Sequence, residues 1–332
     1  MSIEENLVDS KSPAPITETL TLSFDGQTKA LFFLVAKNLL LTLVSLGIYY
    51  PWARNAKRKF MLQHLKLGDQ RFVYTGTGQE LFFGYAKLLV LGGALYAGLI
   101  YAQTLVLGSP WLGFALLSFI VGCFIILGSI ATWGGWAYRL SRTRYRGIAF
   151  SLDPSNRSGF IKKNTLYGFL LYPTFMLILP TLLFQTRKGI YQEIRYGTLA
   201  FSYKGRLKDS YWLSIKNFFL SYFTLGIYFP RALVKRLRFE ADAVVIGDSA
   251  RFRVDHSGLD MFVSVIFPMI INTLSFGLAY PWIGVWGYRR FLSKVRVEGS
   301  IDFASIRPLK QDPSATGESL SELFSLDAGF GV

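Results

Sequence analysis

The sequence has few of the residues with which proteins build disulfides, metal sites and hydrolytic centres. Cys123 is the single cysteine among 332 residues, which excludes an intrachain disulfide, a four-cysteine metal site and a CxxC pair. Its two histidines, His64 and His256, show no HExxH or paired-histidine spacing, so we expect no metal ion and no other cofactor. The G-x-S-x-G motif of serine nucleophiles is also absent.

Charged residues are scarce as well. They make up 17% of the chain, whereas soluble domains carry about a quarter, and apolar residues gather in long runs that suit a bilayer. A net charge of +15 can indicate nucleic-acid binding. Here, however, the basic residues directly follow apolar runs, where anionic phospholipid headgroups explain them more simply. We therefore expect the lipid bilayer as partner and no nucleic acid, while the sequence defines no oligomeric state.

The apolar runs predict an α-helical multi-pass membrane protein. Six segments approach the length of about 20 residues that crosses a bilayer. The last three residues before Trp111 are "GSP", which would join the second and third segments as a tight hairpin. Pro173 and Pro268 lie inside the fourth and sixth, where kinked or re-entrant forms are an alternative. The predicted helices are residues 31–50, 81–107, 111–138, 166–184, 211–229 and 259–280.

The chain also matches itself. "LGIYYPW" at residues 46–52 returns as "LGIYFPR" at 225–231 and more loosely as "FGLAYPW" at 276–282. The flanking residues keep the same register, apart from a one-residue insertion, which predicts an internal repeat. Matching pairs include Pro51 with Pro230, Gly68 with Gly247 and Gly197, and Phe72 with Phe252 and Phe201.

Each repeat is interpreted as an apolar helix, an aromatic–proline stop, a basic helix, a glycine and a short β-strand. The aromatic residues would lie among headgroups, and the basic helix would lie along the interface. The glycine would permit a left-handed helix cap. Candidate strands are residues 21–26, 71–76, 147–152, 198–205, 251–258 and 300–306.

These repeats predict two membrane halves, residues 20–160 and 161–306, between an acidic disordered tail at 1–19 and a disordered tail at 307–332. Their orientation stays open. The repeats could be inverted across the membrane with strands on both faces, or the proline-bearing segments could re-enter and leave the strands on one face. Short strands need partners, which favours gathering them on one face.

These motifs resemble those of the YjgN-like bacterial inner-membrane proteins, a family whose domain has no known function. The resemblance covers about residues 20–305. It implies a multi-pass protein of the bacterial inner membrane and carries no activity or catalytic residues. The family's usual "RWRGIRF" stands here as "RYRGIAF", with Tyr145 and Ala149 at the two differing positions. The matching residues are Leu46 to Tyr49, Pro51, Trp52, Gly68, Phe72, Tyr74 to Gly78, Glu80 to Phe82, and Arg146 to Ile148.

Two Lys-Asn pairs are the first candidate site. Lys37-Asn38 and Lys216-Asn217 recur at equivalent places inside predicted membrane helices, where polar residues are costly. Either the lysines extend to the interface while the asparagines join neighbouring helices, or the pairs bind an anionic ligand.

A second candidate is formed by arginines and acids. Arg142, Arg144 and Arg146 are two residues apart, so on a strand they would point the same way, which suits phosphates; the alternative is positive charge that sets topology. Glu80 and Asp260 would stand at the entrances of apolar helices, at the positive end of the helix dipole.

The sequence thus favours a non-enzymatic inner-membrane protein that binds or transports an anionic lipid or small anionic ligand. The alternatives are a membrane enzyme acting on lipid headgroups, with Glu80, Asp260 and the arginines as its machinery, and a scaffold without a ligand.

Overall fold

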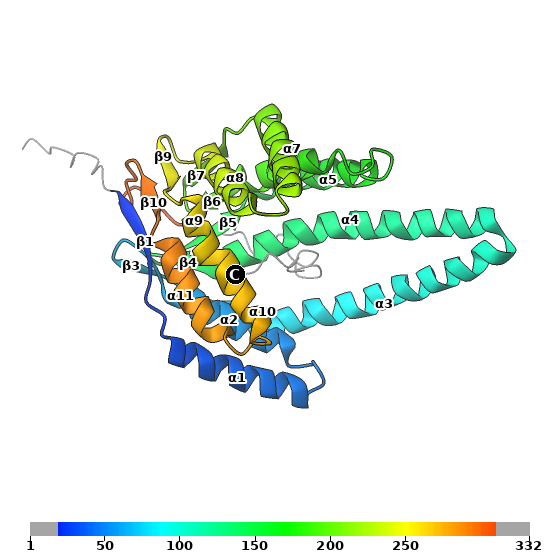
Figure 1. The fold of residues 1–332 in the computed structure, drawn as a ribbon, viewed down its shortest axis with the longest axis horizontal. Helices are drawn as coiled ribbons and strands as arrows, with labels where there is room; N and C mark the ends of the chain where they lie inside the picture. The colour runs from blue at the N-terminus through cyan, green and yellow to red at the C-terminus, as the bar shows by residue number, and fades with distance from the viewer. Residues whose placement is uncertain (1–18, 310–332) are drawn as a thin grey trace, which may run out of the picture.

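The computed structural model describes residues 19–309, and the predicted tails fall almost wholly outside that range. Its central feature is a closed antiparallel β-barrel (Figure 1). The strands follow one another around the barrel in chain order, and β1 closes it by pairing with β10, with Leu20 opposite Val297. The ten strands found between residues 19 and 309 are β1 Leu20–Phe24, β2 Leu65–Leu67, β3 Gln70–Tyr74, β4 Thr143–Tyr145, β5 Ile148–Leu152, β6 Ile194–Tyr196, β7 Leu199–Tyr203, β8 Val244–Ile246, β9 Ala250–Val254 and β10 Val295–Glu298.

Tight turns and helical hairpins alternate as the connections between strands. Each helical hairpin leaves the barrel, turns and returns to the neighbouring strand. Within the described range the hairpins are α1 Thr28–Val44 with α2 Tyr50–Gln63, α3 Gly78–Gly108 with α4 Pro110–Arg142, α5 Arg157–Leu170 with α6 Leu179–Tyr191, α7 Leu207–Phe223 with α8 Phe229–Ala243, and a last one in which α9 Gly258–Met261, a π-helical turn Phe262–Ile266 and α10 Phe267–Leu274 precede α11 Tyr280–Leu292.

The predicted fold of six apolar membrane helices was wrong. The protein is built on the closed barrel, and among the helices of residues 19–309 two are long and apolar enough to cross a membrane, α3 and α4. The other predicted segments, 31–50, 166–184, 211–229 and 259–280, each run through the turn of a hairpin. The short strands were expected, but their closure into one barrel was not.

The turn within each short hairpin explains why hydropathy misled the prediction. At the end of α1, Leu46 has φ 49° and Gly47 has φ 91°, so the helix ends there and the chain reverses. Leu225 with Gly226 and Phe276 with Gly277 adopt the same geometry. "LGIYYPW" is therefore the tip of a helical hairpin, and its apolar letters extend the hydropathy signal across a break in the helix.

The glycine that follows each second helix has a different role from the predicted cap. Gly68, Gly147, Gly197 and Gly247 all have positive φ and lie in the tight turns between paired strands. Such turns require the left-handed region, which glycine adopts without strain. Each glycine thus marks a β-hairpin.

The inward face of the barrel is apolar and layered. Phe72, Phe150, Phe201 and Phe252 occupy the middle of β3, β5, β7 and β9, at the level of Leu22 in β1. Alternate residues of a strand face opposite sides, so the arginines of "ARFRV" in β9 face outward. The register matches of Phe72 with Phe201 and Phe252 are therefore matches of inward-facing residues.

The helical hairpins pack against one another in chain order and close a ring above the barrel. α2 packs on α3, α4 on α5, α6 on α7, α8 on α9, and α11 returns to α1. The second helices α2, α8 and α11 bury residues such as Phe60, Val234 and Val285, so α2 and α8 are not the interfacial helices that their basic residues suggested.

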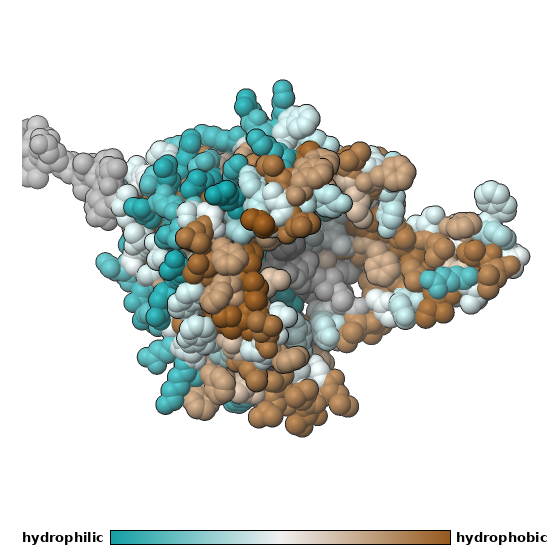
Figure 2. Space-filling model, viewed as in Figure 1, coloured by the Kyte–Doolittle hydropathy of each residue, from teal (hydrophilic) through white to brown (hydrophobic). Residues whose placement is uncertain are grey.

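All strands lie at one end of the molecule, and the α3–α4 hairpin extends away from them (Figure 1). An inverted arrangement with strands on both membrane faces is therefore excluded. Hydrophilic residues cover much of the barrel end, whereas hydrophobic residues gather on the helical hairpins (Figure 2). Residues 300–306, predicted as a strand, instead form an irregular segment across the end of the barrel.

Candidate ligand-binding site

The barrel encloses an apolar cavity of about 460 Å³. That volume lies within the range of about 300–1,000 Å³ that small-molecule sites occupy. Phenylalanines of the middle layer form its waist, and side chains from the ends of α4, α6, α8 and α11 form its helix-side mouth. The lining residues are Leu22, Leu67, Phe72, Leu140, Tyr145, Phe150, Tyr191, Ile194, Tyr196, Leu199, Phe201, Leu237, Glu240, Ala241, Val244, Ile246, Phe252, Val254, Phe291, Val295, Val297, Ile301 and Phe303.

The end of the cavity away from the helices is closed by the segment after β10, residues 299–309, here called the strap. Ile301, Phe303 and Ile306 pack among the barrel residues. The guanidinium of Arg146 stacks 4.5 Å from the ring centre of Phe303. At its far end, the carbonyl oxygen of Arg307 accepts a 3.0 Å hydrogen bond from the backbone N–H of Thr198.

The hydroxyls of two tyrosines that line the cavity, Tyr145 and Tyr196, are satisfied by backbone groups. Tyr145 donates to the carbonyl oxygen of Leu67 and Tyr196 donates to that of Tyr145, both at 2.8 Å. Burial raises the pKa of Tyr196 to about 12, so this phenol is neutral at physiological pH. These hydroxyls are already used, and the wall they belong to is effectively apolar.

Glu240, near the end of α8, is the carboxylate among the residues that line the cavity. One of its oxygens accepts a hydrogen bond from Arg187 at 2.8 Å and forms an ion pair with Arg236 at 2.7 Å. The other accepts the hydroxyl of Tyr203 at 3.1 Å. Burial, followed by the Glu240 charge, raises the pKa of Tyr203, and burial lowers the pKa of Arg236.

More arginines surround the same mouth. Tyr191 lines the cavity, and burial raises its pKa; the charges of Glu240, Arg187, Arg236 and Arg139 also act on it. Arg58 of α2 lies near Arg139 and is 6% exposed. Burial lowers the pKa of Arg58, and the neighbouring Tyr74 opposes that change.

We call Arg58, Arg139, Arg187, Arg236 and Glu240 the basic mouth. Its four guanidinium groups and one carboxylate lie between the helical ring and the apolar cavity. An anionic group attached to an apolar chain matches both parts of this arrangement, because guanidinium groups bind carboxylates and phosphates through several donors at once.

The structure separates the two members of each Lys-Asn pair. Lys37 and Lys216 lie exposed on the outer faces of α1 and α7, whereas Asn38 and Asn217 are buried. The amide of Asn217 donates to the carbonyl oxygen of Ala232 in α8 at 3.4 Å, which joins the two helices of its hairpin. The pairs do not meet one another or the cavity.

The three arginines of the predicted row lie in three elements. Arg142 ends α4, Arg144 lies exposed on β4, and Arg146, with φ 48°, lies in the turn after it. Arg142 donates to Glu80 at 2.7 Å, and Tyr138 donates to the other oxygen of Glu80 at 2.8 Å. Only Arg146 approaches the strap, and none of the three lines the cavity.

Both predicted helix-entrance acids stand at the third position of a helix and complete a capping box. Glu80 does so with Thr77, and Asp260 with Ser257. The ammonium of Lys294, 2.5 Å away, and the hydrogen bonds from Ser257 hold the pKa of Asp260 well below its usual range.

Sequence reasoning missed the cavity and its basic mouth. Arg58 and Arg236 were grouped with the headgroup-facing residues of basic helices, although packing turns them inward. One signal was available: Glu240 stands four residues after Arg236 in the helix "FPRALVKRLRFEADA", in which Asp242 is the other acid. That spacing places the two side chains on the same side of a helix.

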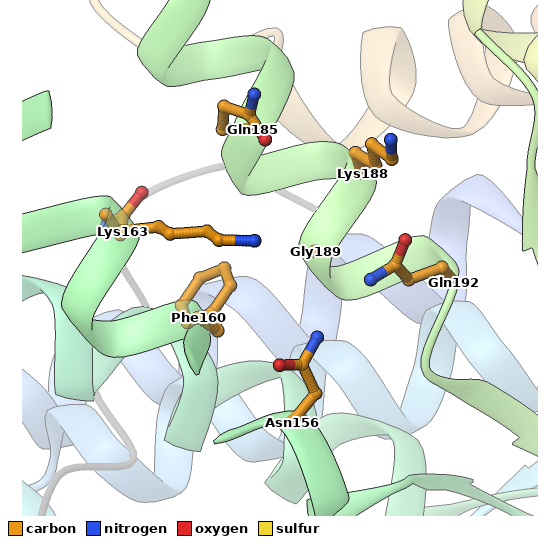
Figure 3. Close-up of a pocket in the computed structure, with 8 residues that line it drawn as sticks. Asn156, Phe160, Lys163, Gln185, Lys188, Gly189 and Gln192 are labelled. Carbon is orange, nitrogen blue, oxygen red and sulfur yellow. The ribbon is translucent and has the colours of Figure 1, made fainter. Parts of the chain in front are cut away.

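A second, smaller pocket of about 80 Å³ lies between α5 and α6 (Figure 3). Lys163, Asn156 and Gln192 point toward it, beside Gly189, where the two helices approach closely. The buried carboxylate of Glu193 already accepts hydrogen bonds from Asn156 and Gln192, both at 3.2 Å. The pocket is too small for a lipid chain. In the described part of the chain, no group of three or more potential metal ligands occurs.

Comparison with known proteins identifies the family. The model of DUF898, described as a bacterial protein of unknown function, matches residues 19–215, which is more than half of the chain. The chain belongs to the DUF898 family. The match begins just before β1 and runs into α7, so it covers the first three helical hairpins and their strands.

Curated relatives carry the name inner membrane protein YjgN. The chain is 23% identical to the one from Salmonella typhimurium strain LT2, over 88% of this chain and 93% of that relative. It is 29% identical to the one from Escherichia coli O157:H7, over 40% of this chain and 31% of the relative. No solved structure matches the chain. These relatives support the predicted resemblance, and we assign this DUF898 protein to the bacterial inner membrane.

Proposed function

We propose that this protein is a multi-pass inner-membrane protein whose barrel binds the apolar chain of an anionic lipid. The observation that carries the proposal is the apolar cavity of about 460 Å³ with a basic mouth on its helix side. A lipid chain would fill the barrel, and its anionic group would lie among the arginines around Glu240. The proposal keeps the ligand class expected from the sequence but moves it from the Lys-Asn pairs to the barrel.

In this proposal α3 and α4 provide the two membrane passes. They contain 31 and 33 residues, which is about 46 and 50 Å of helix, more than the hydrocarbon core of about 30 Å. The turn between them, Gly108–Pro110, is uncharged and is followed by Trp111, which is 87% exposed and suits the far headgroup layer.

The barrel would then face the cytoplasm. The fold brings the basic residues of the second half, such as Arg195, Arg290 and Arg296, to the same end of the molecule as Arg71 of β3. Positive charge accumulates on the cytoplasmic side of inner-membrane proteins. Basic residues of both halves therefore share one side once all strands form one barrel.

Lipid analysis of matched variants tests the proposal. Val295→Trp adds an indole inside the cavity, and Val73→Trp adds the same group on the outer surface of β3, where Val73 is 47% exposed. Protein purified from membranes in mild detergent is extracted, and its lipids are quantified by mass spectrometry. We expect about one equivalent of an anionic lipid with the native protein and with Val73→Trp, and at least about a tenfold loss with Val295→Trp. Equal lipid content in all three would overturn the proposal.

A further inference from the structure

Four short helical hairpins end in exposed apolar tips. Leu46, Phe175, Leu225 and Phe276 occupy the same place in their turns, each with φ near 48–49°, and each is 91–96% exposed. Two residues further on, each tip presents a second exposed apolar side chain. These are Ile48 at 62%, Leu177 at 62%, Ile227 at 84% and Leu278 at 81%.

We infer that these four tips enter the cytoplasmic leaflet of the membrane without crossing it. They surround the foot of the α3–α4 hairpin as re-entrant hairpins, so that the helix ring is seated in the leaflet and the basic mouth lies close to its surface. The inference rests on the proposed two-pass anchor formed by α3 and α4, and not on what occupies the barrel.

Helix lengths set the depth of the tips. Three residues separate α1, α3 and α7 from the barrel strand before each of them, so these helices begin at a common level. If the 31-residue α3 ends at the far edge of a hydrocarbon core of about 30 Å, its first ~16 Å lie outside the core. The 17-residue helices α1 and α7 are about 26 Å long and reach ~10 Å into it. The hairpins splay away from α3 and α4 in Figure 1, and this lowers their depth further.

The exposed lysines agree with this depth. Lys37 precedes the tip residue Leu46 by nine residues, and Lys216 precedes Leu225 by nine. Nine residues of helix span about 13 Å, so a tip ~10 Å deep places both ammonium groups in the headgroup layer, beside phosphates. Full insertion would instead carry these two exposed charges into hydrocarbon, where they are costly.

The occupant of these tips is a lipid leaflet and not another protein. They lie on the helical hairpins, where hydrophobic residues gather, and not on the hydrophilic barrel end (Figure 2). Lone apolar residues on separate, splayed turns do not form a continuous protein-docking patch, whereas each can enter fluid lipid by itself.

Cysteine labelling tests the inference in a Cys123→Ser background. Single cysteines replace Leu46 and Leu225 at two tips, Ser109 in the α3–α4 turn, and Asp69 in the exposed β2–β3 turn. A membrane-impermeant maleimide is applied to cells whose outer membrane alone is permeabilised, where it reaches the non-cytoplasmic face. It is also applied to inside-out vesicles, where it reaches the cytoplasmic face. We expect Asp69→Cys to react from the cytoplasmic side, Ser109→Cys from the opposite side, and the tip cysteines from neither side until the protein is denatured.

Two results would overturn the inference. Tip cysteines that react from the same side as Ser109→Cys would mean that the short hairpins span the bilayer. Tip cysteines that react from the cytoplasmic side, as Asp69→Cys does, would mean that the tips lie in water. Ser109→Cys reacting from the cytoplasmic side would instead refute the anchor. In nanodiscs, a fluorophore on the tip cysteines should also be quenched more strongly by lipids brominated near the headgroup than near the chain end; the reverse order would contradict partial insertion.

Discussion

Single residues of the basic mouth hold the second helices of two hairpins together. Glu240 of α8 accepts hydrogen bonds from Arg187 of α6 and Tyr203 of β7, and it forms an ion pair with Arg236 one turn before it. Its side chain is 15% exposed, so water offers little compensation when the charge is removed. This carboxylate therefore couples the helical ring to the barrel.

We expect Glu240→Gln to lower the free energy of unfolding by about 1–3 kcal/mol, because two guanidinium groups lose their counter-charge in a half-buried site. The matched control is Asp209→Asn. Asp209 pairs with Arg206 at the surface, where side chains are 45% and 82% exposed, and its loss should change stability by less than about 0.5 kcal/mol. Denaturant unfolding in detergent measures both, and equal effects would show that Glu240 is not a structural link.

His256 gives the protein a pH-dependent stability. It is fully buried, its Nε2 lies 2.8 Å from the carbonyl oxygen of Phe291, and burial lowers its pKa. Above about pH 6.5 the histidine is neutral in both states. Below that value the unfolded chain takes up a proton that the folded chain does not, so stability falls as pH decreases.

The expected result is a loss of unfolding free energy between pH 7.5 and 5 that His256→Gln removes in part, because glutamine can still donate to Phe291 but does not titrate. Thermal unfolding at both pH values measures the difference. His64→Gln is the control, since His64 is only partly buried. A pH dependence unchanged in His256→Gln would contradict this role.

At the level of elements, the hairpin tips depend on backbone conformation. Gly226 has φ 87° with nothing within 4 Å of an added Cβ, so an alanine there meets strain and no clash. Gly128 in the middle of α4 also has open space around it, but its backbone is helical. The same substitution should therefore have opposite effects at these two places.

We expect Gly226→Ala to destabilise the protein by about 1–2 kcal/mol through left-handed strain. Gly128→Ala should be neutral or should stabilise it by up to about 1 kcal/mol through helix propensity. Melting temperatures of both variants in one detergent provide the comparison. Destabilisation by Gly128→Ala and not by Gly226→Ala would show that the tip geometry is unimportant.

Local elements were partly predictable from the sequence. The apolar helix, the Pro-started second helix and the strand follow from local signals, and the matches of Phe72 with Phe201 and Phe252 identified residues that share one layer of the barrel. The ends of α1 and α7 were missed because Leu46 and Leu225, at the turns, are as apolar as the helices before them. A hydropathy window averages over such a turn, and only the following glycine marks it.

The whole molecule depends on contacts that no local pattern carries. β1 and β10 pair across almost the full chain, with Leu20 opposite Val297, and the cavity combines residues from most strands. Burial of Arg58 and Arg236 likewise results from ring closure and not from their own helices. The sequence could therefore indicate short strands and basic helices, but neither the barrel nor its mouth.

The contribution of the strap to the stability of the whole fold can be measured with a single substitution. Phe303→Ala removes the ring that covers the cavity and contacts Tyr145 and Arg146. We expect a loss of about 1–3 kcal/mol, below that of a fully buried phenylalanine, because Phe303 is partly exposed. Leu309→Ala is the control, at 50% exposure, and should change stability by less than about 0.5 kcal/mol. Equal stability of the two variants would show that the strap only lies over the barrel.

Pairing of β1 with β10 makes the strand order cyclic, so no hairpin is first or last in space. The start of β1 and the end of β10 lie where the tight turns at Gly68, Gly147, Gly197 and Gly247 join the other strand pairs. A circularly permuted chain would be joined across that position and opened at residues 247–249. It would keep every strand pair and would lose only the covalent turn between β8 and β9. The cyclic order of the strands therefore does not depend on which strand comes first in the chain, and the described part of the molecule is a ring.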